Sequence, residues 1–305
     1  MMRKYVSRLV LCLGIIGIGS ACLAQEAESG LPEKTVMVKG KHVNIELIPS
    51  HFQKNPVEKK MLRALDKCYL AMRDLTGYTP DGGKPVLYRE IPKAGFYGGV
   101  MGAGKEVMMN TTYIDDAIKM FGDGQVAFGW AHEMGHYFDI LGKWYFWDGA
   151  TCEWQGNWKL SYAIETVPLK IKWAPNKNII FQPKGDGEVV SGKQFNDSYF
   201  LFFGDRYLTD STRKWDTMAS DDFHSFFLRV VRAYGWEPFK GWYRTYDRFE
   251  KAGLKEPDSA EAKVNLICAI LSKECGADLV PVFQIWRMPV TEESVKAIKA
   301  KYPVD

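Results

Sequence analysis

The sequence predicts an α+β fold, with a strand-rich N-terminal lobe over about residues 35–145 and a helical C-terminal lobe over about residues 146–305. Two observations carry this prediction. Segments in which apolar and polar residues alternate lie early in the chain, and helical periodicity dominates from residue 126 onward. The 305 residues, 46% hydrophobic and 25% charged, are typical of a globular protein with a substantial core. We expect one domain over residues 25–305.

Alternating residues predict the first strands, and a helical pattern lies between them. The predicted strands cover residues 35–38, 42–48 and 85–88. A helix opens at Asn55, which can cap it, with Pro56 at the first position and Glu58 completing a capping box. Gly77 ends this helix. Its apolar face consists of Val57, Met61, Leu62, Leu65, Cys68, Tyr69, Met72 and Leu75.

A glycine-rich stretch over residues 95–104 contains Gly99, Gly104 and Lys105 at the spacing of a phosphate-binding loop. The next residue is Glu106, where that motif needs Ser or Thr to bind magnesium. We therefore reject the phosphate-binding interpretation and expect a turn that leads into a strand over residues 106–110.

The second half of the chain is predicted to be mostly helical. The candidate helices cover about residues 126–141, 154–165, 221–234, 237–251, 259–274 and 292–301. Residues 166–215 are rich in Gly, Pro, Asn and Asp, and we expect long loops with short strands there.

Residues 1–24 are predicted to be an export signal, because basic residues precede an apolar run too short to span a bilayer. Two cleavage modes compete: lipidation of Cys22, as in a lipoprotein signal, or cleavage after Ala24. Either mode predicts a protein of the periplasm, the cell surface or the medium. Without this segment the chain carries 37 basic and 37 acidic residues, which gives no support for a nucleic-acid partner. A membrane is expected only through a lipid on Cys22.

Four cysteines follow Cys22, an even number that permits two disulfides in an exported chain. Cys268 and Cys275 lie seven residues apart in a predicted helix, a rise of about 10.5 Å. Bridged Cα atoms lie within about 7 Å, so these two cysteines pair only if the helix ends between them. Free buried thiols are the alternative for all four, which are Cys68, Cys152, Cys268 and Cys275.

The strongest functional signal is the HExxH motif formed by His132, Glu133 and His136. Residues four apart share a helix face, so both imidazoles can bind one zinc ion. Glu133 can contact the zinc-bound water without being a ligand, and can take its proton when the hydroxide attacks a carbonyl. The alternative is a structural histidine pair in a packed helix. The chain has only five histidines, and two in this motif favour the zinc site.

A third protein ligand is needed to leave one position for water. The metzincin pattern is excluded, because the chain has Asp139 and Gly142 where that pattern needs glycine and histidine. The downstream carboxylates that could serve are Asp148, Glu153 and Glu165.

Glu153 is favoured as the third ligand because it opens a predicted helix that can pack antiparallel beside the HExxH helix. Asn157 lies one turn further on the same face, and its carbonyl can accept a hydrogen bond from a ligand imidazole. Glu165 lies about 18 Å along this helix from Glu153, so the two cannot both bind the metal. Glu165 and Asp148 remain the alternatives.

These motifs resemble the enhancin-like zinc peptidases, gluzincins that include viral enhancins and bacterial mucin-degrading enzymes. The specific parts are residues 128–136, the Glu153-xxx-Asn157 pair and residues 161–163. The wider resemblance takes in residues 75–78, 234–239 and 278–286, and so covers roughly residues 50–300. Family members often carry glycine at the position of Arg287.

The resemblance implies a gluzincin-like fold with a zinc cleft between the two lobes. It also implies an exported zinc endopeptidase that hydrolyses extracellular proteins, including O-glycosylated, mucin-type substrates. One alternative is a general gluzincin protease without a glycan requirement. Another is a non-catalytic exported binding protein that keeps the zinc fold, although the intact Glu133 argues against it.

Two further groups of side chains are candidates around the metal. A donor to the oxyanion is sought among Tyr162, Tyr199, Tyr207 and His224. Aromatic residues surround the metal segment, and we favour core packing over sugar stacking for most of them. They are Trp144, Tyr145, Trp147, Trp154 and Trp158.

Overall fold

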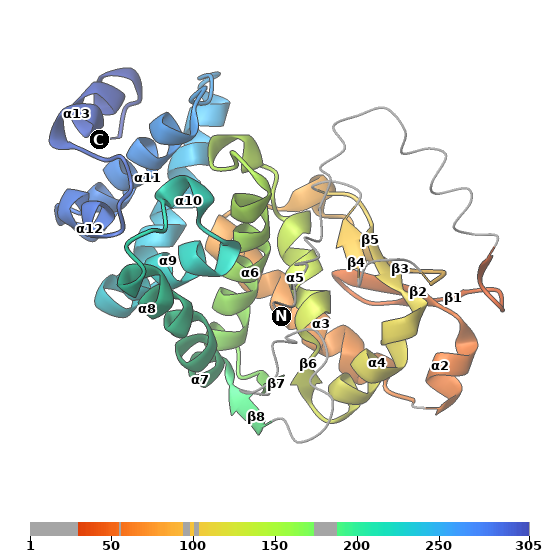
Figure 1. The fold of residues 1–305 in the computed structure, drawn as a ribbon. Helices are drawn as coiled ribbons and strands as arrows, with labels where there is room; N and C mark the ends of the chain where they lie inside the picture. Colours follow the sequence, from red (N-terminus) through yellow and green to blue (C-terminus); the bar gives the residue numbers. More distant parts are fainter. Residues whose placement is uncertain (1–29, 55, 94–97, 101–103, 174–187, 305) are drawn as a thin grey trace.

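The computed structural model describes residues 30–54, 56–93, 98–100, 104–173 and 188–304 (Figure 1). Its largest sheet has the strand order β1-β2-β3-β5-β4. These strands are β1 (Val36–Lys39), β2 (Val43–Leu47), β3 (Val86–Ile91), β4 (Gly98–Val100) and β5 (Val107–Asn110). The three central strands are parallel, and the two edge strands run antiparallel to their neighbours. A second sheet has the order β6-β7-β8, with β6 (Gln125–Val126), β7 (Lys170–Trp173) and β8 (Glu188–Ser191).

The helices lie mostly in the second half of the chain. In the described part of the chain before the HExxH segment, the α-helices are α2 (Pro49–Lys54), α3 (Glu58–Thr76) and α4 (Ile114–Gly122). The HExxH motif is in α5 (Phe128–Tyr137), and α6 (Gly149–Thr166) follows it. The later helices are α7 (Gly192–Phe195), the π-helical turn η5 (Asn196–Phe200), α8 (Leu201–Thr209), α9 (Ser220–Tyr234), α10 (Glu237–Lys251), α11 (Ala260–Cys275), α12 (Val280–Ile285) and α13 (Glu292–Lys301).

Helices α5 and α6 join the large sheet to the C-terminal helices (Figure 1). One side of α5 packs on β4 and β5, and its other side packs on α6. In turn, α6 packs against α3 and α9, and one continuous core runs through both halves. The predicted α+β class is therefore confirmed.

The N-terminal elements follow the sequence pattern closely. The predicted strands are present, and the glycine-rich stretch leads into β5 rather than into a helix. The predicted apolar face of α3 is buried, apart from the half-buried Val57. Gly77 ends α3 in the left-handed conformation (φ 75°), which glycine adopts without steric cost. The helix starts at Glu58 with Val57 at the N-cap, so the expected start at Pro56 is wrong. Asn55 lies outside the described residues.

The helix boundaries around the HExxH motif differ from the prediction. Val126 pairs with Ile171 in a sheet, so α5 starts later than residue 126, and it ends at Tyr137 instead of 141. Helix α6 begins five residues before the expected residue 154, because Asp148 caps it through the Thr151 amide at 2.8 Å.

The expectation of loops and short strands over residues 166–215 is wrong for residues 192–209, which form α7, η5 and α8. Ser191 and Gln194 form a capping box at the start of this segment. Phe195 and Phe200 are buried there, and this packing outweighs the Gly, Asn and Asp content of the sequence.

Arg287 occupies a backbone conformation that glycine favours, with φ 58°. Its guanidinium donates to the carbonyls of Tyr207 (2.6 Å), Asp210 (2.8 Å) and Arg213 (2.9 Å). It also lies 4.4 Å from the centroid of the Tyr207 ring. These contacts offset the backbone strain at this position.

Two expectations about the chain's environment can be compared with the described residues. Cys68, Cys152, Cys268 and Cys275 are all free, and α11 runs without a break through Cys268 and Cys275. No helix in the described part of the chain has the length and apolar character needed to cross a membrane. The predicted export signal and Cys22 lie outside the described residues.

A buried histidine ties three N-terminal elements together. His51 of α2 is 2.5 Å from the Asp115 carboxylate on α4 through Nδ1, and 3.1 Å from Glu90 on β3 through Nε2. Both ring nitrogens face carboxylates, so both donate and the ring is cationic. Burial opposes this charge, but the hydrogen bonds to Glu90 and Asp115 outweigh it and raise the pKa of His51.

We expect His51→Gln to lower the free energy of unfolding by about 2 kcal/mol at pH 6. The folded-state pKa of His51 lies above its unfolded value of about 6.5, so this stabilisation is fully present below that value. It is lost as the pH rises through the folded-state pKa. Urea unfolding of both proteins from pH 6 to 9 measures this. If the difference in unfolding free energy between the two proteins stayed constant from pH 6 to 9, the assignment of His51 as an imidazolium would be wrong.

Candidate metal centre

Helix α5 presents two imidazoles side by side. It is buried along almost its whole length, and His132 and His136 lie one turn apart on the same face. Their Nε2 atoms are 3.1 Å apart, and the ring planes are nearly perpendicular. Phe128 stacks on the His132 ring from the preceding turn, with centroids 6.0 Å apart.

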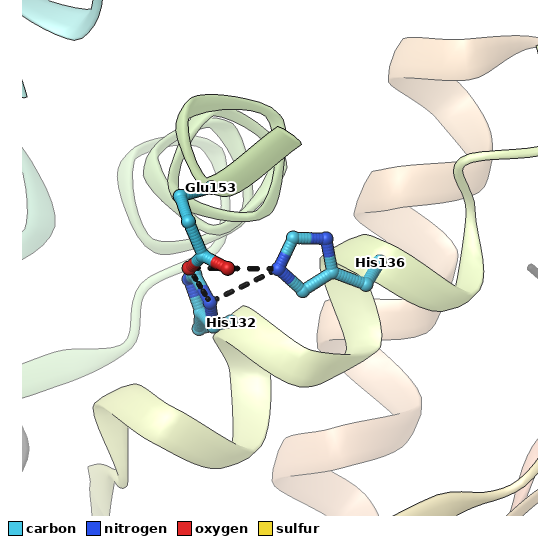
Figure 2. Close-up of side chains that lie close together, drawn as sticks. All are labelled: His132, His136 and Glu153. Atoms are coloured by element: carbon cyan, nitrogen blue, oxygen red, sulfur yellow. Dashed lines mark hydrogen bonds and ion pairs between the residues drawn. The ribbon is translucent and has the colours of Figure 1, made fainter. Parts of the chain in front are cut away.

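The second turn of α6 brings the Glu153 carboxylate to these two imidazoles (Figure 2). Glu153 Oε2 lies 3.3 Å from His132 Nε2 and 3.9 Å from His136 Nε2. Ligand atoms about 2.0–2.1 Å from a tetrahedral zinc ion lie about 3.3 Å from one another. The triangle of nitrogen and oxygen atoms therefore fits three protein ligands of one zinc ion.

The other nitrogen of each imidazole faces an oxygen. His132 Nδ1 lies 2.8 Å from the Asn157 side-chain oxygen, and His136 Nδ1 lies 3.0 Å from the Asp139 carboxylate. Each oxygen accepts a hydrogen bond from Nδ1, which leaves the Nε2 lone pair directed at Glu153. Asn157 thus lies where the sequence analysis expected it. The role of Asp139 was not predicted, because the sequence analysis used this residue only to exclude a metzincin site.

The end of α5 explains how Asp139 reaches His136. The helix tightens there, with the amides of Phe138 and Asp139 donating to the carbonyls three residues earlier. The Asp139 side chain then turns back over the last helical residues. An aspartate three residues after the second histidine, at a helix end, is the sequence signal that could have found it.

Two glycines set the distance between α5 and α6. A β-carbon on Gly135 would lie 2.5 Å from the Gly156 carbonyl oxygen. A β-carbon on Gly156 would lie 2.7 Å from His136 Nε2 and 2.8 Å from His132 Cε1. Side chains at these positions would push the helices or the imidazoles apart. The close approach of the two helices therefore requires glycine at both positions.

Glu133 follows His132 on α5 and is only 7% exposed. Burial raises the pKa of this carboxyl group and Glu153 adds to the effect, while His132 and His136 oppose it. A buried carboxylate beside the ligand triangle can accept a proton from a water molecule bound there.

The alternative ligands are engaged elsewhere. Glu165 makes a two-point ion pair with Arg232, at 2.8 and 3.0 Å, and accepts a hydrogen bond from Asn196. Asp148 accepts from Thr151 as the cap of α6. The structure therefore brings Glu153, and neither alternative, to the two imidazoles. A second grouping joins Cys152 and Asp139 to the Nδ1 side of His136.

Among the four oxyanion candidates, Tyr199 is linked to the ligands through Asp221. Its hydroxyl lies 3.5 Å from Asp221, whose carboxylate interacts electrostatically with His132 and Glu153. Burial and the adjacent Asp222 raise the pKa of Asp221 to about 6. The other three side chains bond elsewhere: Tyr162 to Asp74, Tyr207 to the Trp286 carbonyl, and His224 to Ser161.

The aromatic residues around the metal segment are mainly core residues. Four of them, Trp144, Tyr145, Trp154 and Trp158, have no exposed surface, and Trp147 is half-buried. Trp154 stacks on Phe227 of α9 with centroids 4.3 Å apart. This supports core packing over sugar stacking for the four buried residues.

A comparison with models of protein families gives a match over most of the chain. The model of the family described as "Peptidase M60, enhancin and enhancin-like" matches residues 29–287. A comparison with curated proteins found no match.

Several solved structures share the fold. A functionally unknown conserved protein from Bacillus anthracis (mutant form) has a TM-score of 0.66 at 15% identity, over 93% of this chain and 55% of that one. A metallopeptidase in complex with Tn antigen has a TM-score of 0.58 at 13% identity, over 92% and 52%. The catalytic module of the metalloprotease ZmpA from Clostridium perfringens has a TM-score of 0.52 at 16% identity, over 93% and 50%. The chain thus spans about half the length of these structures.

We expect Gly156→Ala to weaken zinc binding at least about tenfold, because the added methyl group would displace both imidazoles. The matched control is Gly149→Ala on the same helix, where an added β-carbon meets no atom within 4 Å. The zinc dissociation constant of each metal-free protein, measured against a competing chelator, checks this. Equal affinities for the two variants would contradict the steric role of Gly156.

The ligand assignment predicts opposite effects for two glutamates on α6. Glu153→Ala should weaken zinc binding by at least about a hundredfold, because it removes one of three protein ligands. Glu165→Ala should leave zinc affinity unchanged and lower stability, because it leaves the half-buried Arg232 without its main partner. Chelator competition and thermal unfolding measure the two effects. A reversed pattern of zinc affinities would refute the assignment.

Proposed function

Because this chain belongs to the family of peptidase M60, enhancin and enhancin-like proteins, we propose that it is a zinc-dependent endopeptidase. The observation that carries the proposal is the ligand triangle of His132, His136 and Glu153, with the buried Glu133 next to it. A zinc ion held there would act as a Lewis acid and lower the pKa of a bound water toward ~7.

Each residue of the centre has a role in peptide hydrolysis. His132, His136 and Glu153 hold the metal. Glu133 accepts a proton from the attacking water and then delivers it to the leaving amine of the cleaved bond. Asn157 and Asp139 keep the two imidazoles in the tautomer that binds metal.

The large sheet offers a place for the substrate backbone. Strand β4 is one of the two edge strands of this sheet and packs directly against α5. An edge strand presents backbone groups to which an extended peptide can pair. A peptide aligned along β4 would lie beside the helix that carries Glu133.

We propose extracellular proteins as substrates, including O-glycosylated, mucin-type proteins. The support for a glycan is that one structure of the same fold is a metallopeptidase in complex with Tn antigen. We also propose export through residues 1–24, with a lipid on Cys22 as one mode of attachment, from the basic and apolar pattern of that segment. The alternative substrate class is unglycosylated protein, which a general zinc endopeptidase would cleave equally well.

The function is tested with peptides that are matched in sequence, with and without Tn antigen. The zinc-loaded protein should cleave the glycopeptide, and Glu133→Gln should bind zinc with unchanged affinity while losing at least about a thousandfold in kcat/KM. Mass spectrometry of the products and chelator competition provide the two measurements. Cleavage by Glu133→Gln at the parent rate would remove Glu133 as the base. Equal cleavage of both peptides would favour the general protease, and no cleavage of either by the zinc-loaded parent would favour a non-catalytic binding protein.

A further inference from the structure

Lys159 is a fully buried cation two residues beyond Asn157 on α6. Its ammonium group donates to Asp139 Oδ1, and to the backbone and side-chain oxygens of Gln155, both at 3.2 Å. The Tyr243 hydroxyl donates to the same Gln155 side-chain oxygen at 2.6 Å. Lysine is almost never fully buried unless it is paired, so the partner of this side chain is informative.

The partner connects Lys159 to the metal centre. One oxygen of Asp139 contacts Lys159, and the other lies 3.0 Å from His136 Nδ1. The Tyr145 hydroxyl also donates to Asp139, at 3.4 Å. The carboxylate is thus fixed from one side by the cation and holds the imidazole with the other.

We propose that Lys159 is a positioning residue for the metal, acting through Asp139 on His136. This inference rests on the zinc site proposed above. Lys159 fixes Asp139 as an oriented acceptor, so that His136 keeps its proton on Nδ1 and presents Nε2 to the metal. The other ligand, His132, needs no such cation because its acceptor is the neutral amide of Asn157.

Several carboxylates surround the ligands. Glu133 and Glu153 interact with the imidazoles, and so does Asp221. Asp139 is the carboxylate that Lys159 contacts. Without Lys159, Asp139 would be a buried carboxylate with no cation of its own, which is strongly unfavourable.

The charge of Lys159 and its contact with Asp139 predict opposite changes in zinc affinity when Lys159 is removed. If the ammonium acted only by its charge, its loss would remove repulsion toward the metal and tighten zinc binding. If it acts by holding Asp139, its loss would free the acceptor of His136 and weaken zinc binding. Loss of a hydrogen-bond partner of a ligand typically lowers metal affinity about 10–100-fold, and we expect this effect to dominate.

The experiment measures the zinc dissociation constant of the metal-free, full-length protein by competition with a chelator, using zinc alone as the probe. Lys159→Met should weaken zinc binding about 10–100-fold. Asp139→Asn should also weaken zinc binding. The amide oxygen of the new side chain would face the buried Lys159 ammonium, so its NH2 group, which cannot accept a hydrogen bond, would face His136. The double variant carries a neutral acceptor without a cation, as at His132, and should return to within about fivefold of the parent.

Two further measurements separate positioning from general stability. The NMR signals of the His136 ring in the metal-free protein report its tautomer, and Lys159→Met should lose the Nδ1–H form that the parent and the double variant keep. The matched control is Arg232→Met. It removes the cation on α9 that pairs with Glu165, which lies on α6 as Lys159 does. It should lower the midpoint of thermal unfolding and leave the zinc dissociation constant unchanged.

The outcomes distinguish this inference from the proposed function. A parent protein that binds no zinc would overturn the zinc site and the inference with it. A parent that binds zinc, with Lys159→Met binding it equally or more tightly, would overturn the inference alone. If Lys159→Met does not fold, the double variant decides, and a loss of zinc affinity there of tenfold or more would refute the role through Asp139.

Discussion

The metal centre depends on how closely α5 and α6 approach each other. Gly135 and Gly156 lie where the helices cross, and Gly156 also makes room for both imidazoles. This contact lets Glu153 reach two histidines on a neighbouring helix and lets Asn157 reach the far side of one of them. The large sheet and the C-terminal helices hold these two helices in place from outside.

The two histidine ligands are supported by different chemistry. His132 has a neutral amide acceptor on α6, whereas His136 has a carboxylate from the end of its own helix. That carboxylate is buried and is paired with Lys159, again on α6. A single helix therefore supplies a ligand, the acceptor for one imidazole and the cation behind the acceptor of the other.

The parts of the centre that could be predicted from the sequence are those set by local spacing. His132 and His136 share a helix face, and Glu153 and Asn157 share another, so two helical patterns were enough to propose them. Asp139 and Lys159 were missed because their roles depend on how α5 ends and on which side of α6 is buried. A single lysine among Trp154, Trp158 and Tyr162 was the available signal.

The helices, like the metal centre, could be predicted where a local sequence pattern determines them. Strong periodicity located α3, α9, α10, α11 and α13 to within a few residues, because each has a distinct buried face. The segment over residues 192–209 was mistaken for loop, because its helical state depends on a capping box and on aromatic packing with the rest of the core. Amino-acid composition alone does not predict these contacts with the rest of the core.

The order of α5 and α6 along the chain has a consequence for folding. The two helices are consecutive, and only residues 138–148 connect them. Bringing their ends together closes a short loop, which costs less chain entropy than the docking of α10 on α3. The helical hairpin that carries every protein ligand is thus among the most local structures of the molecule, and its assembly does not have to wait for the distant ends of the chain.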